Sequence, residues 1–406
     1  MTAASPDLAS LRRVERADVL KRARHAATLT RTDDGVEFRY LPEWVDRRGP
    51  AVATTLPVGS DPVIRPGGAV PAFFAGLLPE GRRLGAVRRA VKTSADDELS
   101  LLLAVGTDTI GDVQILPTDS DPQLIPPQVI IDDIGQMRFA DLLADFGIRA
   151  QRFALPGVQD KTSAAMLNLP VTRAGERYIL KLTPPEYPFL VENEAFFLEA
   201  ARRSGLTVPL SRTVTDADGR AGLLVPRFDR ITVDGSPVAL AVEDGCQVCG
   251  RPPADKYVLG TERVFAALVE VCDAPAVAAR TLLIQLAFAY VTGNGDAHAK
   301  NFSVLQTPDG EWRASPTYDV PSSQPYGDTT MAMSIGGRSG TDVTWNDLVA
   351  LGGELGLPER AVRRTIAELL ERIDVWLPDL DRLPFDSGRI RKLGRVIAYR
   401  RRLLSQ

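Results

Sequence analysis

The stretch Gly293-Asn294-Gly295-Asp296-Ala297-His298-Ala299-Lys300-Asn301-Phe302-Ser303 decides how the rest of the chain is interpreted. It follows the apolar run 282–291, which predicts a buried helix. The two glycines of the stretch end that helix and let the chain turn. Asp296 stands in the turn, and Asn301 follows five residues later. Aspartate and asparagine are also ordinary turn residues, so the pair has to be weighed together with the rest of the chain.

The spacing of this pair is the spacing that protein kinases use in their catalytic loop. There the aspartate accepts the proton of the substrate hydroxyl, and the asparagine holds a magnesium ion. A second metal-binding aspartate is expected a short strand or hairpin further on, where the chain has Asp319 in Pro316-Thr317-Tyr318-Asp319-Val320. The pattern therefore predicts phosphoryl transfer, with Asp296 as base and with Asn301 and Asp319 as magnesium ligands.

The composition is that of an ordinary globular protein. The 406 residues allow two or three domains, and 44% of them are hydrophobic and 25% charged. The net charge of −4 argues against nucleic-acid binding by the whole chain, although a local basic patch is possible. Residues 1–24 lack the apolar core of a signal peptide, and the longest apolar run, 281–292, is shorter than the roughly 20 residues that span a bilayer. With only three cysteines, we expect a cytoplasmic protein with no membrane partner.

The pattern along the chain predicts a strand-rich part followed by a helix-rich part. For the first 118 residues we expect a surface helix over 1–25, strands over 36–40, 51–57 and 111–117, and helices over 71–81 and 98–105. Four prolines predict a linker at 117–128. Then come strands at 178–182, 223–230 and 238–242 with a helix at 192–203, and finally helices at 263–271, 276–291, 345–355, 359–377 and 387–404. This order is the layout of a protein kinase.

A phosphoryl-transfer site needs further parts, because the protein mainly positions the reactants and neutralises charge. The loop Gly157-Val158-Gln159-Asp160-Lys161-Thr162-Ser163 could bring backbone N–H groups to the phosphates, although it matches no standard glycine-rich motif. Lys181 ends a predicted strand and could pair with the phosphates, but a snorkelling edge-strand lysine gives the same pattern. On the helix that follows, Glu194 or Glu192 could hold this lysine.

The segment Val242-Glu243-Asp244-Gly245-Cys246 joins the two parts of the chain, where a kinase offers its backbone to adenine. Asp244 could then bind the ribose. His298, inside the catalytic loop, is either a general base near neutral pH or a residue that packs the turn and orients Asp296. The pair Cys246-x-x-Cys249 could bind zinc or act in redox chemistry, but a zinc site needs more ligands, and small buried side chains are the alternative.

Taken together, these motifs resemble the HipA family of bacterial serine/threonine kinases, the toxins of HipBA toxin–antitoxin modules. The resemblance runs from about residue 36 to the C-terminus. It is carried by the loop at 157–162, the strand at 178–182, Val225-Pro226-Arg227-Phe228-Asp229-Arg230, Glu243-Asp244-Gly245-Cys246-Gln247, the loop at 295–303 and Tyr318-Asp319-Val320. Further similarity to the N-terminal subdomain of the family lies in 38–44, 77–80 and 111–113.

The resemblance implies an α+β, protein-kinase-like bilobal fold. It has a mixed α/β N-terminal lobe with an extra N-terminal subdomain and an all-α C-terminal lobe. Residues 1–118 would be the extra subdomain, 119–245 the N-terminal lobe with the ATP loop, and 246–406 the C-terminal lobe.

The resemblance also implies roles for single residues. Lys181 would contact the ATP phosphates, Asp296 would be the base, and Asn301 and Asp319 would hold Mg²⁺. The hinge would be formed by Glu243, Asp244 and Gly245. With the loop at 157–162 and His298, these residues complete the predicted catalytic and ATP site.

The family implies partners as well. These are a HipB-like helix-turn-helix antitoxin, through which alone the chain would meet DNA, and a protein substrate such as an aminoacyl-tRNA synthetase. One position departs from the best-known members, which autophosphorylate a serine three residues before the loop glycine, because Ala154 stands there. Two other functions stay open: a kinase-like scaffold that binds nucleotide or antitoxin without activity, and a small-molecule kinase.

Overall fold

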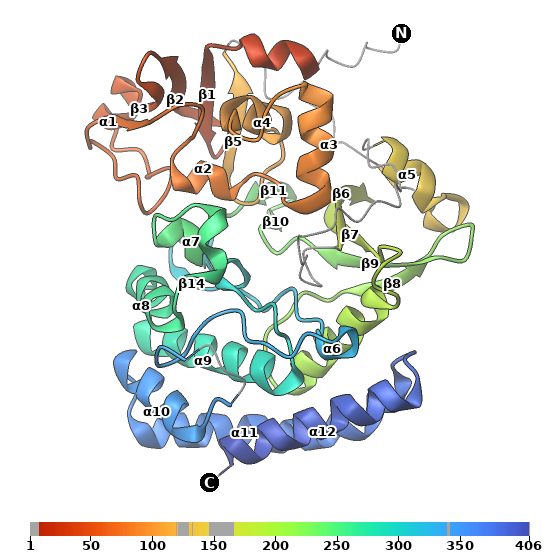
Figure 1. The fold of residues 1–406 in the computed structure, drawn as a ribbon. Helices are drawn as coiled ribbons and strands as arrows, with labels where there is room; N and C mark the ends of the chain where they lie inside the picture. The colour runs from red at the N-terminus through yellow and green to blue at the C-terminus, as the bar shows by residue number, and fades with distance from the viewer. Residues whose placement is uncertain are drawn as a thin grey trace. The chain divides into compact units, whose positions relative to one another are not determined.

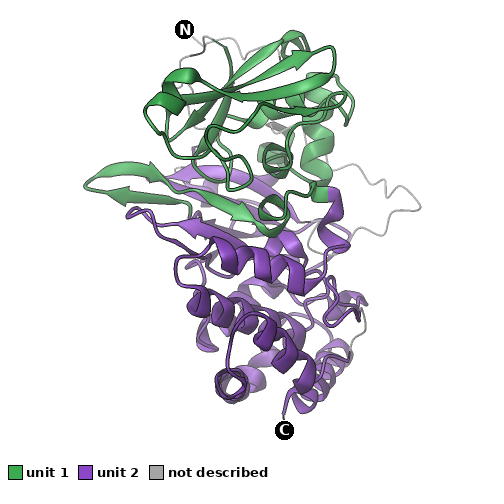
Figure 2. Cartoon of the chain, turned by 90° about the vertical axis from the view of Figure 1, so that its left-hand side faces the viewer, with its two compact units in different colours: residues 1–128, 140–151, 229–253 green, residues 129–139, 152–228, 254–406 purple. Residues whose placement is uncertain are grey.

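The structure is a computed structural model that describes residues 8–118, 120, 130–131, 133–145, 166–338 and 342–405. Two compact units form, and Figure 2 shows them in different colours. The first comprises Met1–Gln128, Ala140–Gln151 and Asp229–Pro253, and the second comprises Val129–Phe139, Arg152–Phe228 and Ala254–Gln406. The predicted linker and the predicted phosphate loop fall largely or wholly outside the described residues.

A five-stranded antiparallel sheet organises the first unit (Figure 1). Its order is β4-β3-β2-β1-β5, with β1 at Arg16–Lys21, β2 at Arg24–Thr32, β3 at Gly35–Tyr40, β4 at Val63–Arg65 and β5 at Val113–Pro117. The surface helix expected over 1–25 is wrong, because only Leu8–Arg13 form a 3₁₀ helix, η1, before β1 begins. Strand β1 pairs on both edges and is buried almost throughout, and periodicity cannot distinguish such a strand from a helix.

Short helices and one hairpin complete this unit. The elements are α1 (Pro42–Asp46), α2 (Ala72–Gly76), α3 (Gly81–Val91), α4 (Glu98–Val105), β10 (Arg230–Val233), β11 (Ser236–Ala239), β12 (Val242–Asp244) and α7 (Gly245–Val248). The predicted strand at 51–57 is wrong, since only an isolated bridge joins Ala53 to Leu56. Two of the family-like motifs meet here, because the Asp229 carboxylate accepts the N–H of Gly111 at 2.9 Å.

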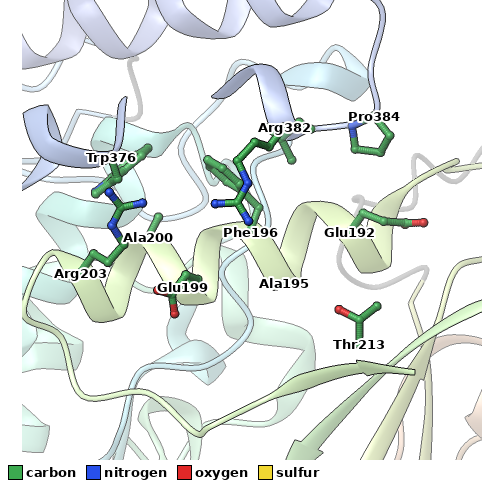
Figure 3. A pocket seen from close by; sticks show the side chains of 11 residues that line it. Glu192, Ala195, Phe196, Glu199, Ala200, Arg203, Thr213, Trp376, Arg382 and Pro384 are labelled. Atoms are coloured by element: carbon green, nitrogen blue, oxygen red, sulfur yellow. The ribbon is translucent and has the colours of Figure 1, made fainter. Parts of the chain in front are cut away.

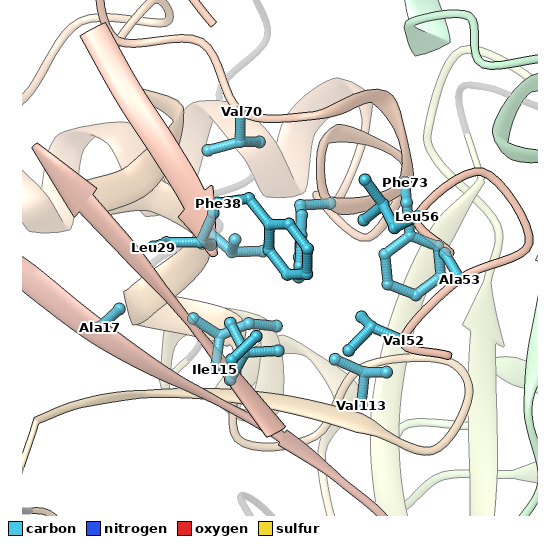
Figure 4. Close-up of a cluster of buried hydrophobic side chains, with 14 of the residues drawn as sticks. Ala17, Leu29, Phe38, Val52, Ala53, Leu56, Val70, Phe73, Val113 and Ile115 are labelled. Carbon is cyan, nitrogen blue, oxygen red and sulfur yellow. The ribbon is translucent and has the colours of Figure 1, made fainter. Parts of the chain in front are cut away.

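Aromatic and branched side chains fill the core of the first unit, as Figure 4 shows. The ring of Phe38 on β3 lies 5.0 Å from Tyr40 and 5.5 Å from Phe74 on α2. A buried ion pair stands beside this core, with Lys21 Nζ 2.7 Å from Asp112 Oδ1. The unit therefore has its own hydrophobic core, as an independent domain requires.

The second unit begins with a four-stranded antiparallel sheet of order β6-β7-β9-β8. Its strands are β6 (Leu167–Arg173), β7 (Glu176–Leu182), β9 (Ala221–Pro226) and β8 (Arg212–Thr215). Helix α6 (Leu190–Arg203) packs against β7, β8 and β9. Lys181 sits on the inner strand β7, opposite Asn168 on one side and Leu223 on the other, so it is not an edge-strand lysine.

The rest of this unit is mainly helical. It contains α8 (Thr261–Val271), α9 (Pro275–Thr292), α10 (Trp345–Glu354), α11 (Glu359–Trp376) and α12 (Ser387–Leu404). The prediction of an all-α C-terminal part is wrong, because β13 (Ser303–Gln306) and β14 (Trp312–Ala314) form an antiparallel hairpin. Its strands are only three or four residues long, which is too short for an alternating pattern to be recognised.

Helix α9 is the central helix and contacts α8, α10, α11 and α12. Among the described helices, only α9 is long and apolar enough to cross a membrane, and 67% of it is buried inside the protein. Burial of that kind is typical of a core helix. The expected mixture of helices and strands is present, whereas the bilobal arrangement and the domain limits at 118 and 245 remain predictions.

Candidate active site

The turn after α9 is held by glycines. Gly293 ends the helix with φ +75°, and a Cβ there would lie 2.4 Å from Cγ of Gln324. At Gly295 a Cβ would lie 2.7 Å from Oγ of Ser323, and the N–H of Gly295 donates to that same oxygen at 2.9 Å. Side chains at these two positions would collide with the segment 322–330, which explains why glycines precede the aspartate.

Asp296 is buried in this loop, with 2% of its surface exposed. Its N–H donates to Asn294 Oδ1 at 3.1 Å, and its Oδ1 accepts the hydroxyl of Tyr257 at 2.8 Å. Asn294 in turn donates its amide to the carbonyl of Asp319 at 3.1 Å. The sequence analysis did not identify Asn294 or Tyr257 as partners of Asp296. Asn294 adjoins the motif and could have been found there, but Tyr257 lies 39 positions upstream and carries no local signal.

Asn301 and Asp319 are brought together by the β13–β14 hairpin, which returns the chain to the catalytic loop. The Nδ2 of Asn301 donates to Asp319 Oδ2 at 3.0 Å. Asp319 has φ +58°, a left-handed backbone conformation that residues other than glycine, asparagine and aspartate rarely adopt. Strained residues of this kind are enriched at ligand-binding and catalytic sites.

Lys181 joins the sheet to this hairpin. Its Nζ lies 2.6 Å from Oε1 of Glu194 on α6 and 3.1 Å from Oδ1 of Asp319. Of the two acids that were proposed to hold Lys181, Glu194 is therefore the one in contact with it. Lys181 and Glu194 are both buried, with exposed fractions of 6% and 1%.

This cluster carries more negative than positive charge. The pKa of Glu194 is raised to about 7, chiefly by burial, with the charge of Lys181 opposing the rise and the charge of Asp319 adding to it. Burial alone would lower the pKa of Lys181, but the two carboxylates outweigh it and raise that pKa. Glu194 Oε2 is buried without a hydrogen-bond partner. One lysine thus faces two carboxylates, and such a site favours an added cation.

The donor set fits magnesium in part. Mg²⁺ usually takes one or two protein carboxylates and completes its shell with water and substrate phosphates. Asp319 supplies the carboxylate, and the amide of Asn301 lies beside it. The described part of the chain holds no cluster of three or more His, Cys, Asp and Glu side chains suited to a metal. Asp319 and Asn301 thus fit a magnesium ion that arrives with the substrate phosphates, with Asn301 Oδ1, which accepts the backbone N–H of His298 here, as the amide ligand.

His298 packs the catalytic loop. The ring of His298 meets Tyr257 edge to face at 5.2 Å, and the backbone N–H of His298 donates to Asn301 Oδ1 at 2.9 Å. The ring is 6% exposed. These contacts favour the packing role for His298 over the role of a base.

The predicted hinge residues have defined local contacts in the first unit. Both carboxylate oxygens of Glu243 accept hydrogen bonds from Thr54, at 2.8 Å from its N–H and 2.7 Å from its hydroxyl. Asp244 caps α7, which Gly245 begins, through a capping box with Gln247. The hinge role itself stays a prediction. The residues of the predicted ATP loop, Gly157 to Thr162, and Ala154 lie outside the described part of the chain.

None of the three cysteines forms a disulfide. Cys246 is buried and Cys249 half-buried, and burial raises the pKa of Cys272 to about 11. A high thiol pKa opposes both thiolate reactivity and metal binding. A small buried side chain is therefore the better description of Cys272.

A separate pocket of about 370 Å³ lies in the second unit along α6 (Figure 3). Its lining comes from α6, from Thr213 on β8 and from the segment 376–384. Phe196, Arg203, Arg382 and Glu192 are among its lining side chains, so the pocket has an aromatic ring and charges of both signs. None of Lys181, Glu194 and Asp319 lines it, so this pocket is distinct from the cluster above.

Comparisons with known proteins agree with the motifs. The HipA-like C-terminal domain matches residues 153–377, and the HipA N-terminal domain matches residues 17–116. Y4mE of Sinorhizobium fredii, named as a candidate kinase, is 33% identical over 402 residues, covering 91% of this chain and 93% of that protein. The serine/threonine-protein kinase toxin HipA of Shewanella oneidensis is 26% identical, covering 86% of this chain and 87% of that protein.

A solved structure supports the fold. The complex of HipA, HipB and operator DNA from Shewanella oneidensis contains a chain that matches this one with a TM-score of 0.77. The match covers 96% of both chains at 20% identity, a level that shows the fold alone. The C-terminal family domain spans more than half of the residues, and a relative above 30% identity spans nearly all of them. This chain therefore belongs to the HipA family of kinases.

Proposed function

We propose that this chain is an ATP- and magnesium-dependent serine/threonine protein kinase and the toxin of a toxin–antitoxin pair in the cytoplasm. The observation that carries the proposal is Lys181, which binds Glu194 on α6 and Asp319 after the catalytic loop. A kinase requires the same lysine–glutamate pair and the same metal-binding aspartate. A scaffold without activity has no need to keep two carboxylates on one buried lysine.

The proposed reaction is transfer of the γ-phosphoryl group of ATP to a hydroxyl group. The hydroxyl oxygen of the acceptor attacks the γ-phosphorus of ATP, the bond from that phosphorus to the β–γ bridging oxygen breaks, and ADP leaves. Asp296 takes the proton of the hydroxyl, which is the role of the aspartate in this spacing. Lys181 orients the phosphates by its charge. Base catalysis of this kind contributes about 100- to 10,000-fold to the rate.

Magnesium would be held by Asp319 and Asn301, and it would neutralise the phosphate oxygens. Lys181 Nζ and Nδ2 of Asn301 both donate to the carboxylate of Asp319, at 3.1 and 3.0 Å. Both groups are thus placed where the phosphates and their cation would arrive. The left-handed backbone of Asp319 holds the carboxylate there.

The partners follow from the relatives. A complex that joins HipA, HipB and operator DNA supports a HipB-like antitoxin as the partner of this chain, with DNA contacted through the antitoxin. A protein acceptor, such as an aminoacyl-tRNA synthetase, is the proposed substrate. Because Ala154 has no hydroxyl, we expect the antitoxin, rather than autophosphorylation at residue 154, to restrain the kinase.

The test is transfer of labelled γ-phosphate from ATP with magnesium. The purified chain is incubated in parallel with the proteome of its own host and with the metabolite pool of that host, and Asp296→Asn serves as the control. Label on serine or threonine of a protein, absent with the control, supports the proposal. Label on a metabolite would replace it with a small-molecule kinase, and label on neither would leave the scaffold.

A further inference from the structure

Tyr257 contacts the proposed base directly. It is the last residue of the 3₁₀ helix η5 (Pro253–Tyr257), and its hydroxyl donates to Oδ1 of Asp296 at 2.8 Å. Asp296 is 2% exposed, so this contact is shielded from water, which would otherwise compete for the carboxylate. A hydrogen bond to a buried charged acceptor is among the stronger ones in proteins.

The ring of Tyr257 is itself held by two neighbours. His298 from the catalytic loop meets it edge to face, with 5.2 Å between ring centroids and an interplanar angle of 73°. Lys256 Nζ lies 5.1 Å from the ring centroid, and this lysine is buried with 8% of its surface exposed. An aromatic pair and a cation–π contact each add stabilisation beyond simple burial. The hydroxyl is thus fixed in place before any substrate arrives.

A carboxylate needs such a fixed partner. The last torsion of an aspartate side chain is broad, so hydrogen bonds to its oxygens decide how the carboxylate is turned. The backbone N–H of Asp296 is bound by Asn294, which fixes the main chain but not the carboxylate. The hydroxyl of Tyr257 fixes one oxygen and with it the plane of the group.

We propose that Tyr257 is a positioning residue for Asp296 and acts by holding the carboxylate in the one orientation that can accept the proton of the substrate hydroxyl. The inference rests on the proposed function, since it assigns Tyr257 to the base of the kinase reaction. It gives His298 a role as well. By packing on Tyr257, this residue supports the base through the tyrosine instead of contacting the reacting atoms.

The first test is Tyr257→Phe, which removes one hydroxyl and keeps the ring that packs on His298. We expect kcat to fall about 10- to 100-fold, the range for loss of one hydrogen bond to a charged group. The KM for ATP should stay within twofold, because no phosphate contact is changed. A matched control is Tyr399→Phe, which removes a tyrosine–aspartate bond of 3.1 Å to Asp342 elsewhere and should leave kcat unchanged.

A double-mutant cycle separates positioning from general stability. In an Asp296→Ala background the tyrosine has no carboxylate to position, so adding Tyr257→Phe should cost no further activity. An equal loss in both backgrounds, or a Tyr257→Phe enzyme with kcat within twofold of the wild type, overturns the inference. The thermal midpoints of the two Tyr→Phe variants are compared to exclude unfolding.

A structural readout keeps the inference apart from the proposed function. High-resolution crystal structures of the wild type and Tyr257→Phe are compared at Asp296. One carboxylate orientation in the wild type and several in the variant support positioning, even if the wild type transfers no phosphate and the kinase proposal fails. A single unchanged orientation in the variant overturns positioning, even if the wild type is an active kinase.

Discussion

Two buried lysines in this protein sit among carboxylates, and their surroundings differ in charge balance. In the first unit, Asp112 accepts from Lys21 at 2.7 Å and from Arg22 at 3.2 Å, so two cations share one acid. Lys21 also donates to the carbonyl of Val52 at 3.2 Å. In the second unit the ratio is reversed, because Lys181 alone serves both Glu194 and Asp319.

We propose that the difference separates a structural ion pair from a functional one. In the network of Lys21, one acid faces two cations, so the charge of the acid is compensated within the protein. The network of Lys181 leaves Glu194 Oε2 without a partner and holds an acid whose pKa burial raises to about 7. Arrangements that cost stability are enriched at sites where they support binding or chemistry. We therefore expect substitutions in the network of Lys181 to alter mainly activity, and substitutions in the network of Lys21 to alter mainly stability.

The largest effect is expected from Asp319→Asn. Asparagine tolerates the left-handed backbone at this position and removes only the charge, whereas alanine would add backbone strain. Metal-assisted charge stabilisation is worth several kcal/mol, so transfer should fall by about 10,000-fold. Turnover is measured against magnesium concentration, with the thermal midpoint as control. Unchanged turnover would show that the metal site lies elsewhere.

Asp296→Asn should cost about 1,000-fold in turnover, within the usual range for a general base. This residue belongs to neither lysine network, so ATP affinity should match the wild type. In cells, the variant should relieve any growth arrest caused by overproducing the chain without its antitoxin. Toxicity that persists with a stable variant would point to a binding mechanism.

Lys21→Met should act on stability alone. Breaking a buried ion pair costs about 3–5 kcal/mol, and Arg22 keeps this case near the lower end. We expect a thermal midpoint several degrees lower and an unchanged turnover for each folded molecule. The exposed Lys392→Met on α12 is the control, with no change in either quantity. A loss of turnover in folded Lys21→Met would contradict a purely structural role.

The sequence predicted the helices of the second unit closely. Ser387–Leu404 matched in full and α10 and α11 to within one residue, because long amphipathic helices carry a strong period. The strands β1 and β2 were missed, and the helix α3 was not expected at all. Central strands buried on both faces lack alternation, and a short arginine-rich helix resembles a loop.

The candidate site was predicted as a set of motifs but not as a set of contacts. The spacing identified Asp296, Asn301 and Asp319, and the structure places Asn301 against Asp319. Which acid holds Lys181 depends on which face α6 turns to the sheet, and the sequence left Glu192 and Glu194 equal. Tyr257 was missed since a hydrogen bond between residues 39 positions apart is a property of the fold alone.

The smallest effect, and the sharpest distinction between the two networks, is expected from Glu194→Gln. Glutamine keeps the shape of the side chain and removes its negative charge. Lys181 then keeps Asp319 as its anionic partner, and its ammonium group is held less firmly. We expect the KM for ATP to rise by about three- to tenfold, the value of one weakened contact to a charged group, with kcat reduced less. A matched control is Glu192→Gln, two residues earlier on α6 and in the lining of the pocket in Figure 3, which should leave both constants unchanged.

The pH dependence of stability tests the same change independently of activity. The pKa of Glu194 in the folded state is about 7, above its ordinary value of 4.5, so ionising this buried carboxyl opposes folding. The cost is absent below pH 4.5, grows between pH 4.5 and 7, and is complete above pH 7. Glutamine never ionises. Relative to the wild type, the thermal midpoint of Glu194→Gln should therefore be higher at pH 8 than at pH 5. A difference that stays constant over this range would mean that Glu194 is as well balanced by Lys181 as Asp112 is by Lys21, and the contrast between the two networks would disappear.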